Sequence, residues 1–295
     1  MPPLRVALIA LGTTLLAPPL KAQQVAGELP RTLVSADRLG TEEGSVIAAT
    51  GLTGEDLSER RAGTSDSAQL LDSVAGLSFY SGGGVSSLPA IDGLADDRLH
   101  ILVDGMSIGA SCPNHMNPPL SYIDPGAVGS ASVLNGITPV SVGGDSIGGT
   151  IAFRSADPTF AAPGEGPRAG GSLGIFYRNN GDAESANARG SLASEHLYAG
   201  VTFASTDAGD YRDGDSQSVR STQYKTRNGQ VVLATRFDDQ LVTLEAGWQR
   251  IPYQAFANEY MDMTRNASSS WNARYAGDFG WGRLEARLYR QHVRH

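Results

Sequence analysis

In Leu197-Tyr198-Ala199-Gly200-Val201-Thr202-Phe203, apolar side chains at every second position alternate with Tyr, Gly and Thr. Because successive side chains of a strand point to opposite faces, this period of two predicts a strand with one apolar face. The same alternation recurs at residues 172–177, 242–249 and 284–288. From about Gly170 onward, the chain is therefore predicted to form long antiparallel strands.

Two folds fit such strands, a β-barrel in lipid and a soluble β-sandwich. Turn signals at Asn180-Gly181-Asp182 and Asp238-Asp239 would join the strands. The charges at Arg283, Glu285 and Arg287 suit a wet lumen, although they also suit the solvated face of a sandwich. Strand length and an export signal favour the barrel.

The export signal covers residues 1–22. Arg5 gives it a basic start, Val6–Leu20 is nearly all apolar, and Ala22 is a small residue suited to cleavage. The apolar stretch is short and broken by Gly and Pro, so it is not predicted to be a membrane helix.

The charge balance is 23 basic against 31 acidic residues, a net charge of −8. Such a chain is not predicted to bind nucleic acid and is compatible with attracting cations. No catalytic triad stands out among the five histidines, so no enzymatic activity is expected.

Residues 44–160 have a different pattern, with short strands and one short helix. Strands are predicted at Ser45–Ala48, Leu99–Val103, Ala131–Leu134 and Thr150–Arg154. A helix is predicted over Asp66–Val74, with Thr64 or Ser65 as its N-cap. This part is expected to be a compact α+β unit.

Four ordered blocks of this unit resemble the plug domain of TonB-dependent outer-membrane receptors. The blocks are residues 70–77, 91–94, 100–106 and 135–151. The resemblance implies an α+β plug inside an antiparallel transmembrane β-barrel of about 22 strands, in the outer membrane of a Gram-negative bacterium. Asp92 departs from the family pattern, which usually has arginine before that glycine.

The family also implies contacts with outer-membrane lipid and with TonB, which pulls on an extended segment near the mature N-terminus. Within the predicted extension 23–43, the candidate for that segment is Glu28–Ser35, and a plain linker is the alternative. The plug is predicted over 44–160 and the first part of the barrel over 161–295.

The single cysteine lies in the run Cys112-Pro113-Asn114-His115-Met116-Asn117-Pro118-Pro119. Because an exported chain meets an oxidising space, an unpaired cysteine is either a reactive group or a buried inert thiol. Thiolate and thioether sulfur favour Cu(I), whereas zinc rarely accepts a thioether and hard ions prefer oxygen. The prolines predict a stiff loop that presents the sulfurs.

Cys112 and Met116 resemble the Cys-x-x-x-Met pair in the plug of the copper-receptor branch of the family. The resemblance implies import of copper as Cu(I), with these two residues as ligands. His115 is a further candidate ligand. His295 is the only late candidate for the family's second pair, His-x-Met, whose methionine would follow the last residue of the chain.

Weaker candidates and other functions stay open. Met261 and Met263 are predicted to face one side of a strand, either as a methionine path for copper or as lumen packing. The alternative functions are a receptor for another metal or a metal chelate, and a periplasmic copper electron-transfer or storage protein. The last would need His100 as an upstream ligand.

The length of the strand region indicates how much of a barrel this chain can form. Residues 170–295 number 126, which gives roughly six to eight strands, whereas a barrel around a plug needs about 22. The chain is therefore expected to be an N-terminal fragment of a receptor, with the barrel incomplete.

Overall fold

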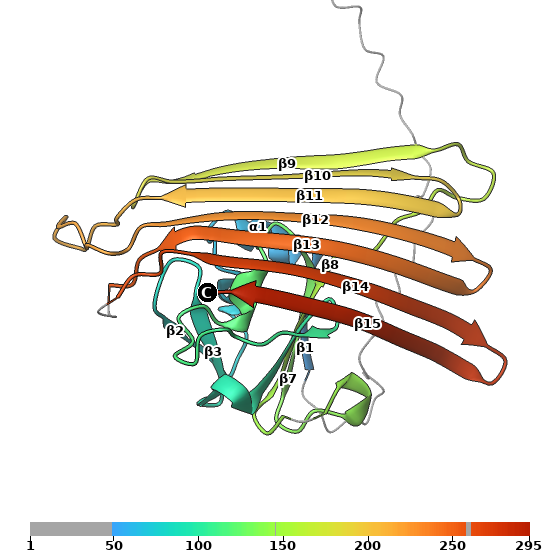
Figure 1. Cartoon of the computed structure of the whole chain (residues 1–295), viewed down its shortest axis with the longest axis horizontal. Helices are drawn as coiled ribbons and strands as arrows, with labels where there is room; N and C mark the ends of the chain where they lie inside the picture. Colours follow the sequence, from blue (N-terminus) through green and yellow to red (C-terminus); the bar gives the residue numbers. More distant parts are fainter. Residues whose placement is uncertain (1–48, 145, 258–260) are drawn as a thin grey trace, which may run out of the picture. The chain divides into compact units, whose positions relative to one another are not determined.

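The computed structural model describes residues 49–144, 146–257 and 261–295. The predicted signal peptide, the segment Glu28–Ser35 and the predicted strand Ser45–Ala48 lie outside the described residues. The described part contains an N-terminal α+β unit, called the plug below, and a sheet of long strands (Figure 1).

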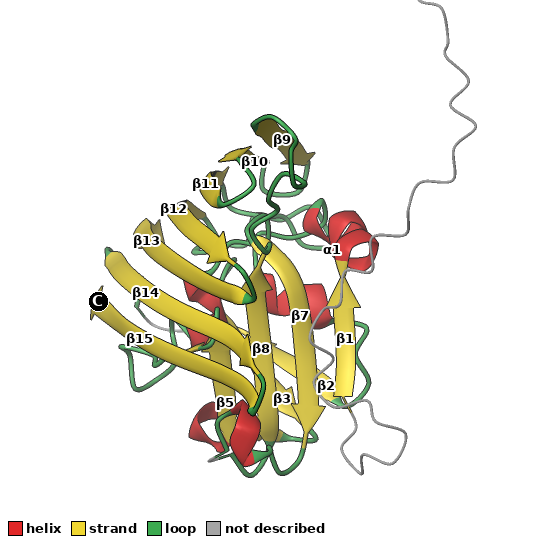
Figure 2. Ribbon diagram, turned by 90° about the vertical axis from the view of Figure 1, so that its right-hand side faces the viewer, coloured by secondary structure: helices red, strands yellow, loops and turns green. Residues whose placement is uncertain are grey.

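The plug contains eight strands and five short helices among the described residues. In chain order they are β1 (Ala49–Thr53), α1 (Gly54–Arg61), η1 (Ser67–Leu71), β2 (Leu77–Ser81), β3 (Ser87–Ile91), β4 (Leu94–Ala95), η2 (Asp96–Arg98), β5 (Leu99–Val103), β6 (Met106–Ser107), η3 (Pro119–Tyr122), β7 (Val128–Asn135), η4 (Val140–Val142) and β8 (Gly149–Ser155). Figure 2 shows β1, β7 and β8 side by side; they belong to a sheet of order β1-β7-β8-β5-β6, and β2, β3 and β4 form a second sheet.

The plug core is apolar and lies around β8. Ile151 and Phe153 on this strand are fully buried between β7 and β5, and Leu70 and Leu120 complete the packing. Complete burial of each such side chain contributes about 1.5–3 kcal/mol. The predicted strand Leu99–Val103 is confirmed, because β5 occupies the same residues.

The predicted helix is shorter than expected. Only Ser67–Leu71 is helical, as a 3₁₀ turn, and the cap is Asp66 rather than Thr64 or Ser65. The Asp66 carboxylate accepts hydrogen bonds from the backbone N–H groups of Ala68 at 3.1 Å and Ser87 at 2.8 Å. These bonds fix a tight turn that ties η1 to β3. Helix α1 was not predicted, and Leu57 is its one buried apolar residue.

The sheet of long strands contains seven antiparallel strands in chain order, within the predicted six to eight. They are β9 (Arg168–Arg178), β10 (Ala183–Ala193), β11 (Leu197–Ala208), β12 (Tyr224–Phe237), β13 (Gln240–Gln254), β14 (Asn266–Phe279) and β15 (Gly282–Arg294). The end of this sheet at which β9, β11, β13 and β15 terminate is called the loop end below, and it lies on the left in Figure 1.

The two faces of this sheet differ in polarity. Leu173 and Ile175 are 72% and 73% exposed on one face, and Leu197, Val201 and Leu288 are also exposed. A sandwich would cover such a face with a second sheet, whereas in this structure it is the opposite face that meets the plug. The arrangement matches the wall of an antiparallel barrel, in which apolar side chains face outward. Among the described residues, no helix is long and apolar enough to cross a membrane.

Hydrogen bonds from the strands hold the plug. The Gln249 side chain donates to the backbone oxygen of Ser121, and Arg189 donates to the backbone oxygen of Gly126 at 3.2 Å. The plug segments that follow Cys112 are therefore anchored to particular strands, which sets the position of the candidate site.

Candidate metal centre

The structure brings three sulfur-containing side chains into one buried cluster. Cys112 and Met116 come from the plug and are 8% and 7% exposed, and Met263 comes from the connection between β13 and β14 and is 4% exposed. The other members of this sulfur cluster are Val85, Ala183, Ala208, Tyr224, Ile251 and Phe256. The cluster therefore spans the plug and the strands.

A tight turn shapes the plug part of the cluster. The backbone N–H of His115 donates to the carbonyl of Cys112 at 3.0 Å, and His115 has a positive φ of 51°. Pro118 and Pro119 follow and lead directly into η3. Because the turn and the prolines restrict the backbone, both sulfurs are presented by the stiff loop that the sequence predicts.

His115 points toward another part of the plug. Its Nε2 lies 3.4 Å from a carboxylate oxygen of Asp96, and it lines a small pocket that neither Cys112 nor Met116 lines. The structure thus places His115 beside the two sulfur residues in sequence without joining its ring to the sulfur cluster.

His295 lies at the same end of the sheet as Met263. It follows β15, whose last residue, Arg294, pairs with Ala267 on β14. Ala267 comes four residues after Met263 in the chain. The topology therefore carries His295 to the loop end, where its side chain is exposed.

The two methionines of the β13–β14 connection do not share a face. Met263 is buried, whereas Met261 is 57% exposed. The prediction of strand neighbours was wrong because β13 ends at Gln254, and Met263 only forms a single bridge back to Gln254 through two backbone hydrogen bonds of 2.9 and 2.8 Å.

Two buried amides at the loop end lack partners. Asn117 follows Met116 and is fully buried, and Asn266 begins β14 three residues after Met263 and is 1% exposed. In both side chains, neither the amide nitrogen nor the amide oxygen has a hydrogen-bond partner among the described residues. Such atoms are costly when buried and mark places where a ligand or water completes the structure.

The donor set at the loop end is soft. Among the described residues, no three side chains of His, Cys, Asp or Glu come together as a metal-binding group. Hard cations such as Mg²⁺ and Ca²⁺ prefer several oxygen ligands, whereas the sulfur cluster offers thiol and thioether groups. Sulfur from Cys112, Met116 and Met263 is the donor type that the site offers.

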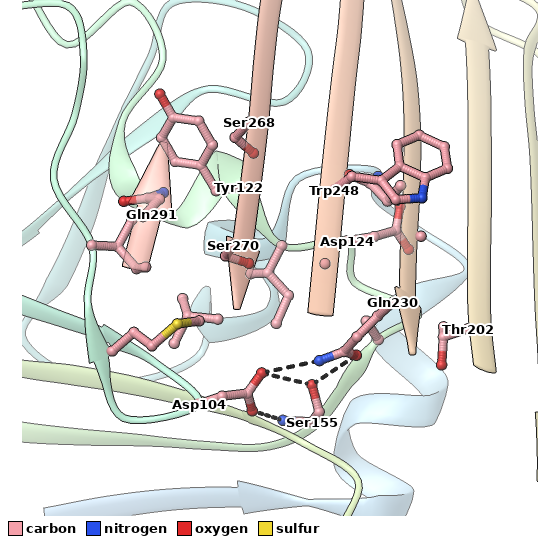
Figure 3. Close-up of a pocket in the computed structure, with 18 of the residues that line it drawn as sticks. Asp104, Tyr122, Asp124, Ser155, Thr202, Gln230, Trp248, Ser268, Ser270 and Gln291 are labelled. Carbon is pink, nitrogen blue, oxygen red and sulfur yellow. Dashed lines mark hydrogen bonds between the residues drawn. The ribbon is translucent and has the colours of Figure 1, made fainter. Parts of the chain in front are cut away.

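A second contact between plug and strands is polar and is called the polar joint below (Figure 3). The Asp104 carboxylate accepts hydrogen bonds from the Ser155 backbone N–H at 2.6 Å, the Ser155 hydroxyl at 2.9 Å and Gln230 at 3.4 Å. The Asp104 backbone oxygen accepts from Asn272 at 3.0 Å and from Arg287. Burial raises the pKa of the Asp104 carboxyl, so these donors offset a desolvation cost.

Asp124 lies on the wall of the cavity beside the polar joint, as Figure 3 shows. It accepts hydrogen bonds from the Gly126 N–H at 2.7 Å and from Asn228 at 3.4 Å. Burial nevertheless raises the pKa of Asp124 to about 6. The cavity holds about 80 Å³, and its wall combines polar groups such as Asp124 and Asn228 with apolar side chains such as Val103 and Ile108.

Similarity to known proteins agrees with this architecture. The family described as TonB-dependent Receptor Plug Domain matches residues 42–150. No curated protein matches the chain.

Several solved structures share the fold. The copper transporter OprC is 25% identical, with a TM-score of 0.72 over 84% of this chain. The FrpB iron transporter from Neisseria meningitidis (F3-3 variant) is 18% identical, with a TM-score of 0.69 over 85% of this chain. The Serratia marcescens hemophore receptor HasR is 19% identical, with a TM-score of 0.65 over 83%.

The chain is shorter than these proteins. It covers 37% of the OprC chain, 41% of the FrpB chain and 38% of the HasR chain. The shared part consists of a plug and the strands that follow it.

Proposed function

Because this chain belongs to the TonB-dependent receptors of the Gram-negative outer membrane, we propose that it serves copper import and binds Cu(I) through Cys112 and Met116. Copper is the cargo of the receptor and not a resident cofactor. The main support for this proposal is that these two sulfur residues are buried in one cluster at the loop end. Thiolate and thioether together favour Cu(I) over zinc and over hard cations.

Further donors would come from the strands. Met263 already belongs to the sulfur cluster, and His295 lies at the same end of the sheet. We assign His295 as the nitrogen ligand that closes over copper once it is bound. His115 is a weaker ligand candidate because its ring is held by Asp96.

The direction of import follows from the connections between strands. At the loop end, β11 and β12 are joined by residues 209–223 and β13 and β14 by residues 255–265, whereas the opposite end has turns such as Asp238-Asp239. Receptor barrels of this kind place long loops outside the cell and short turns in the periplasm. The sulfur cluster would then meet copper on the outer side of the plug, while the exposed apolar face contacts lipid.

The energy for import would come from TonB through Glu28–Ser35. Deletion of this segment should abolish energised copper uptake and leave copper binding unchanged. If uptake survives the deletion, Glu28–Ser35 is not the segment on which TonB pulls.

A receptor for another metal or a metal chelate is the main alternative, because the FrpB iron transporter shares the fold. The sulfur donors favour copper over iron at this site. The structure gives less support to a periplasmic electron-transfer protein than to a receptor. His100, the upstream ligand that it needs, bonds to Ser107 at 3.2 Å and is not in the sulfur cluster.

The test is competition for Cu(I) against a colorimetric chelator, with the full chain in detergent. Cys112→Ala should weaken Cu(I) binding by about 100-fold or more, about 3 kcal/mol. Met116→Leu should weaken it by about tenfold, because its shape is kept and only the sulfur is lost. Met106→Leu is the matched control, since Met106 is buried in the plug core and outside the sulfur cluster. Unchanged affinity in Cys112→Ala would refute the assignment.

A further inference from the structure

Strands β12 to β15 lie side by side in the sheet of long strands (Figure 1), and three arginines form a row across them near the loop end. Arg227 on β12 is directly paired with Arg250 on β13. Arg250 is paired with Ala267 on β14, which in turn is paired with Arg294 on β15. Because paired residues of neighbouring strands point to the same face, the three exposed side chains lie on one face. They are called the arginine row below.

The arginine row lies on the apolar face of the sheet. Trp248, two residues before Arg250, is 42% exposed, and the guanidinium carbon of Arg250 lies 5.9 Å from the centre of the Trp248 ring. Leu244 on β13 and Leu288 on β15 are exposed on the same face, farther from the loop end. Along β13 this face therefore changes from leucine to tryptophan to arginine. Membrane-facing strands change in this order from the hydrocarbon core through an aromatic girdle to the lipid headgroups.

The charge of the arginine row is not neutralised by acidic side chains. Among the described residues, no carboxylate forms an ion pair with Arg227, Arg250 or Arg294. Arg294 donates to the ring of His292 at 3.1 Å, which supplies no negative charge. Like charges that are directly opposite in an antiparallel pair are destabilising. The pair of Arg227 and Arg250 therefore has a cost that an anion between the two side chains would offset.

The opposite end of the same face is aromatic as well. Phe237 at the end of β12 and Phe279 at the end of β14 are exposed there. Arg236, beside Phe237, points to the other face, where it donates to the backbone oxygen of Ala161 at 2.8 Å. Both ends thus have the aromatic side chains of a membrane interface, whereas the arginine row belongs to the loop end.

We propose that the arginine row binds the phosphate groups of a phosphorylated glycolipid, lipid A, in the outer leaflet of the outer membrane. Guanidinium groups match phosphate oxygens with paired N–H donors, and the acyl chains would lie along the leucines farther from the loop end. Adjacent strands are about 4.8 Å apart, so the row spans about 15 Å, which allows more than one phosphate to be held. From the proposed function this inference takes only the outward orientation of the loop end, and it does not depend on copper.

The test is lipid binding, measured by native mass spectrometry of the full chain in detergent. Diphosphorylated lipid A is compared with lipid A from which both phosphates have been removed. The wild-type chain should bind the phosphorylated form at least about tenfold more tightly. The double variant Arg227→Gln/Arg250→Gln should lose this preference, whereas Arg227→Lys/Arg250→Lys should retain part of it because the charge is kept. Arg294 stays unchanged in both variants because His295 follows it.

Arg212→Gln is the matched control, because Arg212 is exposed in the loop between β11 and β12 and lies outside the arginine row. In lipid-free detergent, Arg227→Gln should not lower the unfolding temperature, because it removes a like-charge pair. A lower unfolding temperature would mean that Arg227 has a structural partner and would count against the lipid site.

Three results would overturn the lipid site. They are equal binding of both lipid forms by the wild-type chain, a preference that survives in Arg227→Gln/Arg250→Gln, and displacement of lipid A by millimolar inorganic phosphate, which would indicate a site for any small anion. Cu(I) affinity should be the same in the wild-type chain and in these variants. If the wild-type chain binds no copper but keeps its lipid preference, the proposed function fails and the lipid site stands.

Discussion

The plug meets the strands in two chemically different places, the sulfur cluster and the polar joint. In the polar joint, every side chain that contributes makes at least one hydrogen bond, and Asp104 alone accepts from four residues. Beside the sulfur cluster, Asn117 and Asn266 make none, although both are buried. In the polar joint the Asn272 amide nitrogen is bonded and only its oxygen lacks a partner, whereas at the loop end both amide atoms of Asn117 and of Asn266 lack one among the described residues.

This difference is the one that the proposed function requires, with the polar joint holding the plug and the loop end free to receive a ligand. Buried polar groups without partners are retained at a cost in stability. At the loop end the cost coincides with soft sulfur donors. A binding site explains this coincidence better than a structural contact does.

The largest effect on the comparison is expected from Asp104→Ala. This change removes the acceptor of Ser155 and Gln230, so the plug should lose about 3 kcal/mol of stability or more, because each of the two donor residues left unpaired costs about 1–3 kcal/mol. Hydrogen exchange of the β8 amides measures this loss, and copper affinity should not change. Asp72→Ala is the control, since Asp72 forms an exposed ion pair with Arg60, and such pairs contribute at most about 1 kcal/mol. A changed copper affinity in Asp104→Ala would show that the polar joint and the sulfur cluster do not act separately.

A pH effect of similar or smaller size is expected at Asp124. Because burial raises its pKa from 3.8 to about 6, the folded state binds a proton more tightly than the unfolded state. The contribution of Asp124 to plug stability should therefore be greatest below about pH 4 and be lost, by up to about 3 kcal/mol, as the pH rises through 6. Asp124→Asn should remove this part of the profile and leave the part due to Asp66, whose pKa burial also raises to about 6, as measured by denaturant unfolding at several pH values. A profile that is unchanged in the variant would assign the titration to another group.

The smallest effect is expected from Asn117→Leu. Replacement of an unpartnered buried amide by an apolar side chain of similar size should raise the stability of the copper-free protein by about 1 kcal/mol. Thermal unfolding measures the change. Asn272→Leu is the matched comparison and should destabilise, because Asn272 donates to Asp104 and Glu245. Destabilisation by Asn117→Leu of the same size would mean that Asn117 has a structural partner after all.

The sequence predicted the parts of the fold that follow from periodicity. The alternation in Leu197–Phe203 predicted strand β11 and its apolar face. The predicted strand Leu99–Val103 has the same first and last residues as β5. It did not predict α1, because a helix with one buried apolar residue leaves no periodic signal. It misplaced the cap of η1 because the helix begins at Ser67 and not at Asp66, so that the Asp66 carboxylate accepts from Ala68 and also from Ser87.

The candidate site was predictable in part. Cys112 and Met116 stood out by their chemistry and spacing, whereas the direction of the His115 ring depends on Asp96, which the fold brings near. The burial of Met263 apart from Met261 depends on where β13 ends. The missing partners of Asn117 and Asn266 are properties of the packed structure, so no sequence pattern could reveal them.

X-ray absorption spectroscopy of the Cu(I)-loaded chain at the copper edge tests the central claim most directly. We predict a first coordination shell with at least two sulfur scatterers, of which one is lost in Cys112→Ser and one in Met116→Leu. A shell of nitrogen and oxygen alone, or one that is unchanged in both variants, would contradict a copper site at Cys112 and Met116.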